Sequence, residues 1–243
     1  MQFYSLTDKG KYRSNNEDFC LAEKVGEYTL LILADGMGGA NGGEIASKTA
    51  VETVQAHIVE KLKNSPSLAQ IPRILSSAIE KANTQIYNLS KSDINYKGMG
   101  TTLDICVVSG KSVYIAHIGD SRVYKVTSAG EITRLTKDHS LVEYMIETGA
   151  LTPEEALNHP QKNIITRALG TTTSTEADII NRPFEESDFL LMCSDGLSNM
   201  LDEKSIAEII SGNLSPSEKA TSLIDLANDA GGTDNITVIL AQI

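Results

Sequence analysis

The chain has 243 residues, of which 41% are hydrophobic and 22% charged, a composition typical of a folded globular protein rather than a disordered chain. Its 32 acidic side chains outnumber its 21 Lys and Arg, and the formal charge of −11 disfavours nonspecific binding to nucleic acids and anionic membranes. No apolar run approaches the roughly 20 residues of a membrane span, and the N-terminus lacks a signal-peptide core. We therefore expect a cytoplasmic protein with one domain over residues 1–243.

Eight short segments have the composition of β-strands, because they are rich in β-branched, aromatic or leucine residues and are bounded by Gly, Asp, Asn or Ser. They cover residues 18–25, 28–34, 102–109, 112–118, 121–127, 131–136, 188–194 and 235–243. Four of them follow one another through short turns between residues 102 and 136. Parallel neighbours would need long crossovers, so this succession predicts antiparallel meanders.

Helical spacing of apolar residues predicts two long helices, at residues 43–63 and 71–89, each with one apolar stripe that should lie on a sheet. Two further helices are expected near the C-terminus, one after Asp202 and one after a capping box that begins at Ser215. A shorter helix should begin at Thr152. Antiparallel strands with helices grouped in pairs predict an α+β fold, a sandwich of sheets covered by helices.

The three cysteines, Cys20, Cys106 and Cys193, lie far apart, in or beside strand-like segments, and no two have the CxxC spacing. Free buried thiols are therefore predicted, in preference to a disulfide or a metal site. None of the three is followed by an arginine after five intervening residues, which excludes the Cys-x5-Arg phosphate loop of the tyrosine phosphatases.

Acidic residues stand at the ends of apolar strands. Asp35, Asp120 and Asp195 each lie beside a glycine just after a strand, and Asp234 precedes the last strand. If these ends converge, the carboxylates raise one another's pKa and destabilise the fold unless cations lie between them. The available ligands are all oxygen, which favours Mg²⁺ or Mn²⁺, and two such ions roughly 4 Å apart can activate water for attack at phosphorus. A single Asp-Gly pair is more often an ordinary turn, so this interpretation depends on convergence.

The N-terminal segment from Thr7 to Asp18 contains groups that a phosphate-cleaving site would need. Arg13 offers a planar fork of donors for two phosphate oxygens, and Asp18 adds a carboxylate five residues later. A lone arginine is usually a solvated surface residue. Arg13 is therefore a candidate only in combination with the acids.

Seven motifs follow one another along the chain: DKGKYRSNNED, ADGMGG, GMGTTL, GDSR, DHS, SDGL and GGTDNITV. They occur in the order seen in the metal-dependent protein phosphatases of the PPM, or 2C, type, and the chain resembles stand-alone bacterial members of that family from Asp8 to Ile243. The resemblance implies a β-sandwich of two antiparallel sheets flanked by pairs of helices. It also implies a binuclear Mn²⁺ or Mg²⁺ centre that hydrolyses phosphoserine and phosphothreonine in proteins.

The resemblance further implies which residues bind metal. Asp35 would bridge two metal ions, and the carbonyl of Gly36 would bind the second. Asp195 and Asp234 would complete the protein ligands of the first ion. Asp120, together with Asp195, matches the position that holds a third, weaker metal in bacterial relatives.

Two catalytic roles and a mobile segment also follow from the resemblance. Arg13 would grip the substrate phosphate, and Asp18 would act through metal-bound water. The segment at about 138–165 matches a flap beside the site that is thought to influence substrate choice. Its mixed polarity and short expected helix fit a mobile cover.

The proton donor for the leaving oxygen is where the chain departs from the family. Many animal members carry a histidine where this chain has Met37, and many bacterial members carry one where it has Ala40. Three candidates remain: metal-bound water, His159 on the flap, and no side-chain acid at all. An exposed histidine before a proline is also an ordinary loop residue.

We predict a serine/threonine phosphoprotein phosphatase in which a metal-bridging water attacks phosphorus without a covalent intermediate. Its expected partners are phosphorylated proteins and a cognate Ser/Thr protein kinase, and we expect a monomer. One alternative is an inactive phosphoprotein-binding regulatory module, which the presence of all four metal acids and Arg13 disfavours. Another is a hydrolase of small phosphoesters on the same fold, which a panel of substrates would distinguish.

Overall fold

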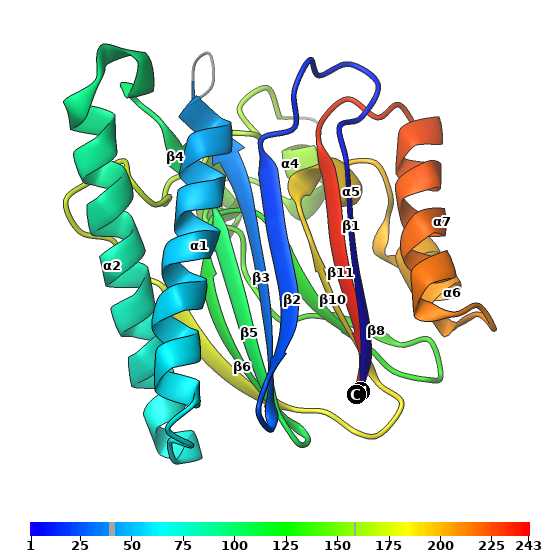
Figure 1. Cartoon of the computed structure of the whole chain (residues 1–243). Coiled ribbons are helices and arrows are strands. Elements are labelled where there is room, and N and C mark those ends of the chain that lie inside the picture. Colours follow the sequence, from blue (N-terminus) through cyan, green and yellow to red (C-terminus); the bar gives the residue numbers. More distant parts are fainter. Residues whose placement is uncertain (39–41, 158) are drawn as a thin grey trace.

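The computed structural model describes residues 1–38, 42–157 and 159–243. Two antiparallel β-sheets lie face to face, and a pair of helices covers the outer face of each (Figure 1). The predicted α+β sandwich is therefore confirmed. None of the helices in the described ranges has the length and apolar character that crossing a membrane would need.

The five-stranded sheet has the order β1-β11-β10-β7-β8. Its strands are β1 (Gln2–Asp8), β7 (Arg122–Val126), β8 (Ile132–Arg134), β10 (Phe189–Cys193) and β11 (Ile236–Gln242). The other sheet has the order β2-β3-β5-β6-β9, and the short β4 pairs with β3. Its strands are β2 (Asp18–Val25), β3 (Tyr28–Met37), β4 (Gly100–Thr101), β5 (Leu103–Ser109), β6 (Ser112–Ile118) and β9 (Asp178–Pro183).

Helices α1 (Gly42–Leu62) and α2 (Ile71–Ser92) cover the six-stranded sheet, and α6 (Glu203–Ser211) and α7 (Pro216–Asp229) cover the five-stranded sheet (Figure 1). The predicted caps of the last two are confirmed, since Asp202 accepts from the Ser205 amide and Ser215 forms a capping box with Glu218. The remaining helices are short: α3 (Leu141–Glu147), α4 (Pro153–Leu157), α5 (Asp195–Ser198) and the 3₁₀ turns Leu68–Gln70 and Ile94–Tyr96.

Strand β3 is buried on both faces, and this burial fixes its register relative to the neighbouring strands. Leu30 and Ile32 pack against the helices, whereas Leu31 and Leu33 pack between the two sheets. Full burial of one such side chain stabilises the fold by about 1.5–3 kcal/mol. A shift of register by one residue would exchange the two faces, so the position of the residue that follows this apolar run, Asp35, is firmly determined.

The four strands between residues 102 and 136 form two hairpins, β5–β6 and β7–β8, as the short turns predict. The two hairpins lie in different sheets, however, because the chain crosses from one sheet to the other between Ile118 and Arg122. Gly119 has φ of +116°, a conformation that favours glycine, at this crossing. The crossing leaves Asp120 at the edge of the sandwich rather than inside a continuous sheet.

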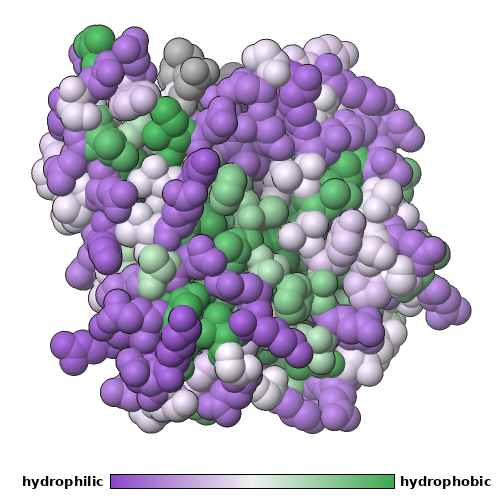
Figure 2. Space-filling model, viewed as in Figure 1, coloured by the Kyte–Doolittle hydropathy of each residue, from purple (hydrophilic) through white to green (hydrophobic). Residues whose placement is uncertain are grey.

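Strands β1, β4 and β9, and helices α3 and α5, were not predicted from the sequence. Strand β4 has only two residues, and β1 and β9 lie at sheet edges and are only partly buried, so their apolar pattern is weak. The cysteines are free thiols, as predicted, although Cys20 is only half-buried. In the view of Figure 2, hydrophobic side chains reach the surface between α1 and α7, whereas the loop between β1 and β2 at the top is mostly hydrophilic.

Candidate functional site

The predicted acids lie at one edge of the sandwich. Strands β3 and β6 both pair antiparallel with β5, so they run in the same direction and bring Asp35 and Asp120 to the same edge. Strands β10 and β11 pair antiparallel with each other, so the end of one meets the start of the other, and Asp195 lies near Asp234. Both pairs of strand ends lie at the upper edge in Figure 1.

A pocket of about 310 Å³ opens at this edge. It is lined by the four acids, by Arg13 and Gly36, and by Glu17, Met37, Gly38, Asn163, Ile165 and Asn235. Five of the seven motifs, spread over the whole sequence, thus supply residues to a single cavity. Glu17 and Asn235 belong to two of those motifs, but the sequence analysis assigned neither a role.

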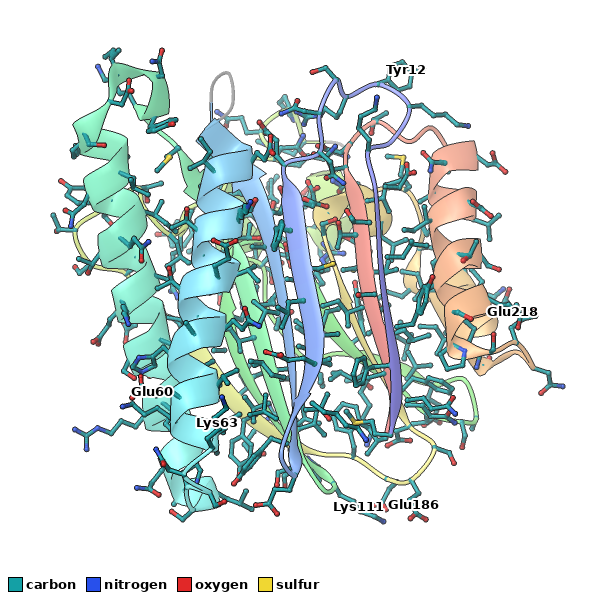
Figure 3. All side chains as sticks on the ribbon, viewed as in Figure 1. Tyr12, Glu60, Lys63, Lys111, Glu186 and Glu218 are labelled. Atoms are coloured by element: carbon teal, nitrogen blue, oxygen red, sulfur yellow. The ribbon has the colours of Figure 1, made fainter. Side chains whose placement is uncertain are left out.

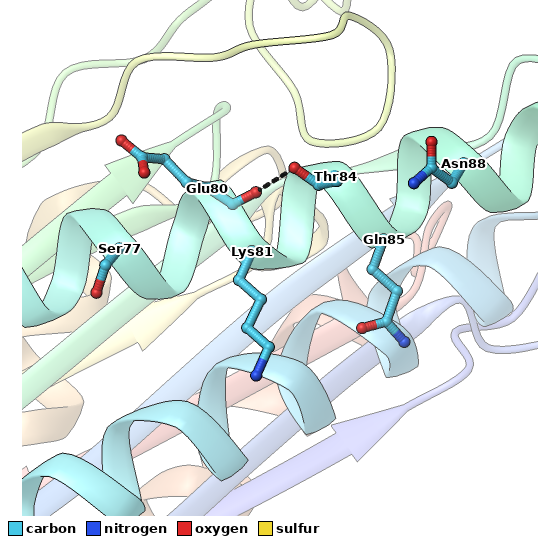
Figure 4. Close-up of a pocket in the computed structure, with 6 residues that line it drawn as sticks. All are labelled: Ser77, Glu80, Lys81, Thr84, Gln85 and Asn88. Atoms are coloured by element: carbon cyan, nitrogen blue, oxygen red, sulfur yellow. Dashed lines mark hydrogen bonds between the residues drawn. The ribbon is translucent and has the colours of Figure 1, made fainter.

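Another pocket, of about 590 Å³, lies along α2 and does not have the character of a catalytic site. All six lining residues belong to that one helix, and Figure 4 shows Lys81 and Gln85 on one side of it and Glu80 on the other. The one hydrogen bond drawn there, from Thr84 to the carbonyl of Glu80, lies within the helix. No set of charged groups converges in this pocket.

The acids of the edge pocket are only partly exposed, and their charges oppose one another. Burial, followed by the charges of Asp18 and Asp195, raises the pKa of Asp35 well above its ordinary value. Burial and the charge of Asp234 raise the pKa of Asp195 to about 6. Burial and the charge of Asp195 raise the pKa of Asp120 to about 7. A bound divalent cation would relieve this repulsion.

Asp18 lies behind the pocket and does not line it. It is the ladder partner of Asp35 across β2 and β3 and is only 6% exposed. Its Oδ2 accepts hydrogen bonds from the hydroxyls of Ser194 (2.8 Å) and Thr237 (2.6 Å). Its Oδ1 is buried and has no hydrogen-bond partner among the described residues. Burial raises the pKa of this carboxyl to about 7, although the two hydroxyls oppose the increase.

Arg13 reaches the pocket from the loop between β1 and β2. Its Nη2 donates to Oδ2 of Asp234 at 2.6 Å, and its side chain is 50% exposed. Tyr12, its neighbour, is 76% exposed and projects from the top of the molecule in Figure 3. The guanidinium is thus close to the acids and still accessible to a ligand.

The backbone around Asp35 is held by hydrogen bonds and by close packing. The amide of Asp35 donates to Oγ1 of Thr102, and its carbonyl accepts from the Thr102 amide and the Thr101 hydroxyl, at 2.8–2.9 Å. A Cβ at Gly36 would lie 2.1 Å from the carbonyl oxygen of Gly43. Only glycine therefore fits at this position, beside the carbonyl that the resemblance assigns to a metal.

The turn that carries Asp120 is tied to the DHS motif. Arg122 donates through Nε and Nη2 to the carboxylate of Asp138, with distances of 2.7–3.1 Å. The amide of Gly119 donates to Nδ1 of His139, and the amide of His139 donates to the carbonyl of Gly119. The base of the segment at about 138–165 is thereby connected to the acidic edge.

A second cavity, of about 560 Å³, adjoins the acidic pocket and shares Asp120, Asn163 and Asp195 with it. Helices α3 and α4 of the predicted flap supply one side, and the region from α5 to the start of α6 supplies the other. The lining combines apolar side chains, such as Leu157 of α4, with charged ones. A groove of mixed polarity therefore leads from the acids along the flap.

His159, one of the candidate proton donors, lines neither of these two cavities. Its Nδ1 accepts a hydrogen bond from the amide of Gln161 at 3.2 Å, so the ring caps its own turn. Met37 does line the acidic pocket, but its thioether carries no proton. Ala40, the other position that departs from the family pattern, lies outside the described residues.

The donor set fits hard divalent cations. It consists of carboxylate oxygens with the carbonyl of Gly36, the ligands that Mg²⁺ and Mn²⁺ prefer. Within the part of the chain that the structure describes, no group of three or more His, Cys, Asp and Glu side chains is arranged to hold a metal ion. A divalent cation between the acids would offset their mutual repulsion.

The chain is similar to known proteins over its whole length. The family model described as protein phosphatase 2C matches residues 10–228. The serine/threonine phosphatase stp of Listeria monocytogenes is 40% identical, with 97% of this chain and 93% of that protein covered. The structure of the S. agalactiae serine/threonine phosphatase superposes with a TM-score of 0.93 at 43% identity, covering 98% of each chain. The catalytic domain of PstP in complex with two manganese ions gives 0.86 at 35% identity, covering 99% of this chain and 97% of that one.

Proposed function

The chain belongs to the protein phosphatase 2C family, and on this premise we propose that its acidic pocket is the catalytic centre of a metal-dependent serine/threonine protein phosphatase. The observation that carries the proposal is the convergence of Asp35, Asp120, Asp195 and Asp234 with Arg13 in one pocket. An inactive binding module is not favoured, because such a module has no need to keep a set of mutually repelling acids. The substrates are phosphorylated proteins.

The metal-binding roles follow from the family and from the fit of the donor set. We propose that Asp35, the carbonyl of Gly36, Asp195 and Asp234 hold two Mn²⁺ or Mg²⁺ ions. Asp120 and Asp195 are proposed to hold a third, weaker ion. When bound, the ions polarise phosphoryl oxygens and make water a stronger nucleophile.

The chain's own side chains bind the phosphate and orient the attacking water. The guanidinium of Arg13 can donate two parallel hydrogen bonds to non-bridging oxygens of the phosphate, which fixes the phosphorus relative to the acids. Asp18 does not line the pocket, so we propose that its Oδ1, which has a free acceptor position behind Asp35, accepts a hydrogen bond from an intervening water and thereby helps to orient water in the pocket. No cysteine lines the pocket, which agrees with direct attack by water.

The leaving oxygen is proposed to receive its proton without a side-chain acid, because His159 does not line the pocket. The replacement His159→Ala should then lower kcat/KM on an alkyl phosphoester and on an activated aryl phosphate by the same small factor, within about twofold. Steady-state kinetics on both substrates measure this. A loss of tenfold or more confined to the alkyl ester would instead assign the proton to His159.

The segment at about 138–165 is proposed to be a flap that contacts the protein chain of the substrate. It supplies the apolar side of the groove of about 560 Å³, and Leu157 at its surface is 70% exposed. We propose that the protein acts as a monomer. A Ser/Thr protein kinase must supply the phosphorylated substrates, and we propose that one such kinase is its functional partner.

The substrate class is tested by a panel of phosphoserine, phosphothreonine and phosphotyrosine peptides together with small phosphoesters, each with Mn²⁺. The proposal expects the highest kcat/KM on the phosphoserine and phosphothreonine peptides. A preference for the small esters or nucleotides would identify a small-molecule phosphoesterase instead. Hydrolysis that is restricted to phosphotyrosine would contradict both functions.

A further inference from the structure

The loop between β1 and β2, residues 9–17, carries Arg13 and has no helix or strand of its own. The Arg13 side chain is half exposed, and its one side-chain hydrogen bond within the described residues is to Asp234. Packing of the side chain therefore does little to fix its position. The direction in which the guanidinium points is set by the backbone of the loop together with the ion pair to Asp234.

Asn235 holds this loop at both ends. It is 5% exposed and stands directly before β11. Its Nδ2 donates to the carbonyl of Lys9 and to the carbonyl of Asn15, both at 2.9 Å. Its Oδ1 accepts from the amide of Glu17 at 2.8 Å. The side-chain amide of Asn235 thus makes three hydrogen bonds to the backbone of the Arg13 loop, at Lys9, Asn15 and Glu17.

Asn235 also contacts the residues that carry the acids. Its own amide donates to Oδ1 of Asp234 at 2.8 Å. A Cβ at Gly196, next to Asp195, would lie 2.0 Å from its carbonyl oxygen, so the start of α5 packs directly on it. The phosphate-binding loop and two of the acids therefore meet at one buried residue.

We propose that Asn235 is the positioning residue of Arg13, and that it sets the distance between the guanidinium and the acids. This inference rests on the proposed function, in which Arg13 binds the substrate phosphate. Only a carboxamide can both donate to the two carbonyls and accept from the amide at this position. An aspartate would place an oxygen that cannot donate against the carbonyls of Lys9 and Asn15. An alanine would leave those carbonyls and the Glu17 amide without partners. A loop that must be ordered at each binding event binds more weakly than one that is held in advance.

The test compares Asn235→Ala, Arg13→Ala and the double variant in saturating Mn²⁺. Each is assayed for KM and kcat on a phosphoserine peptide and for inhibition by inorganic phosphate. Asn235→Ala should raise KM and the phosphate inhibition constant about tenfold, a loss comparable to one hydrogen bond to a charged group. The double variant should be no worse than Arg13→Ala, because Asn235 acts through Arg13.

A matched control and a second readout separate positioning from general stability. Asn83 is also buried, at 2% exposure, and binds a different loop by donating to the Thr172 carbonyl and accepting from the Gly170 amide. Asn83→Ala should lower the melting temperature by a similar amount and leave KM unchanged. In Asn235→Ala the Glu17 amide should exchange its hydrogen faster. If the alanine variant does not fold, Asn235→Asp, of the same size, takes its place and should also raise KM.

The outcomes distinguish the inference from the function on which it rests. If Arg13→Ala leaves KM and phosphate inhibition unchanged, the proposed role of Arg13 fails. If Arg13→Ala raises both constants but Asn235→Ala raises neither, the positioning role is overturned while the function stands. Losses that multiply in the double variant would also overturn it.

Discussion

Replacing Asp35 by asparagine is expected to lower kcat/KM on a phosphoserine peptide about a thousandfold or more in saturating Mn²⁺, equivalent to about 4 kcal/mol. Asparagine keeps the size of the side chain but removes the charge at the end of β3, where the acids of both sheets meet. Steady-state kinetics at several Mn²⁺ concentrations measure the effect. Activity within tenfold of wild type would show that the charge of Asp35 is not needed.

The same substitution should stabilise the EDTA-treated protein at neutral and alkaline pH. Burial and neighbouring acids raise the pKa of the Asp35 carboxyl in the folded state, so the unfolded chain releases this proton at a lower pH. The folded state of the wild type therefore loses stability as the pH rises from the pKa of Asp35 in the unfolded chain toward its pKa in the folded protein. Below the unfolded pKa, about 4, the group is protonated in both states and its effect disappears.

Thermal unfolding in EDTA at pH 4 and at pH 8 tests the sign of this effect. Asp35→Asn should melt above wild type at pH 8, and the difference should shrink at pH 4. A variant that loses activity and is also less stable at pH 8 would indicate damage to the fold rather than loss of a metal ligand. The two readouts together therefore separate function from folding.

Gly36→Ala is expected to destabilise the protein by about 2–4 kcal/mol and to lower activity about a hundredfold. The added Cβ would lie 2.1 Å from the Gly43 carbonyl oxygen and 2.6 Å from that of Glu17. Both obstacles are backbone atoms, so the start of α1 or the end of β3 must move. Movement of β3 would displace Asp35 from the other acids.

Urea denaturation and the peptide assay measure the two effects of Gly36→Ala. Gly212 at the end of α6 is the matched control, because the nearest atom to a Cβ there would be the carbonyl oxygen of Ile209, at 3.3 Å. Gly212→Ala should stay within about 1 kcal/mol of wild type. If Gly36→Ala behaves like this control, the close packing at the end of β3 does not matter for the site.

Much of the fold could be predicted because local chemistry determined it. The two long helices follow from apolar spacing, and the caps at Asp202 and Ser215 follow from residues within one turn of each helix start. The edge strand β1 was missed because its polar and apolar residues alternate only weakly. The crossing between the sheets at Asp120 was missed. A short turn predicts that two neighbouring strands pair, but it does not predict to which sheet each pair belongs.

The convergence of the four acids could be predicted from their positions at strand ends, three just after an apolar strand and Asp234 just before one, since strand ends are where a sheet presents side chains to a pocket. Glu17, Asn235 and Thr102 could not be assigned roles in the same way. Their roles depend on contacts between segments that are far apart in the chain, such as the bonds of Asn235 to the loop at residues 9–17. A polar residue in a loop does not reveal its partner from the sequence.

The central claim, that acids from both sheets form one metal-dependent centre, is tested most directly by titrating Mn²⁺ into EDTA-stripped protein while following phosphoserine peptide hydrolysis. The measurement is made on wild type and on Asp195→Ala in parallel. We predict that wild type rises from negligible to full activity and saturates, whereas Asp195→Ala stays near the baseline at every concentration. Full activity of the stripped protein before any metal is added, or the same titration curve for both proteins, would contradict the account.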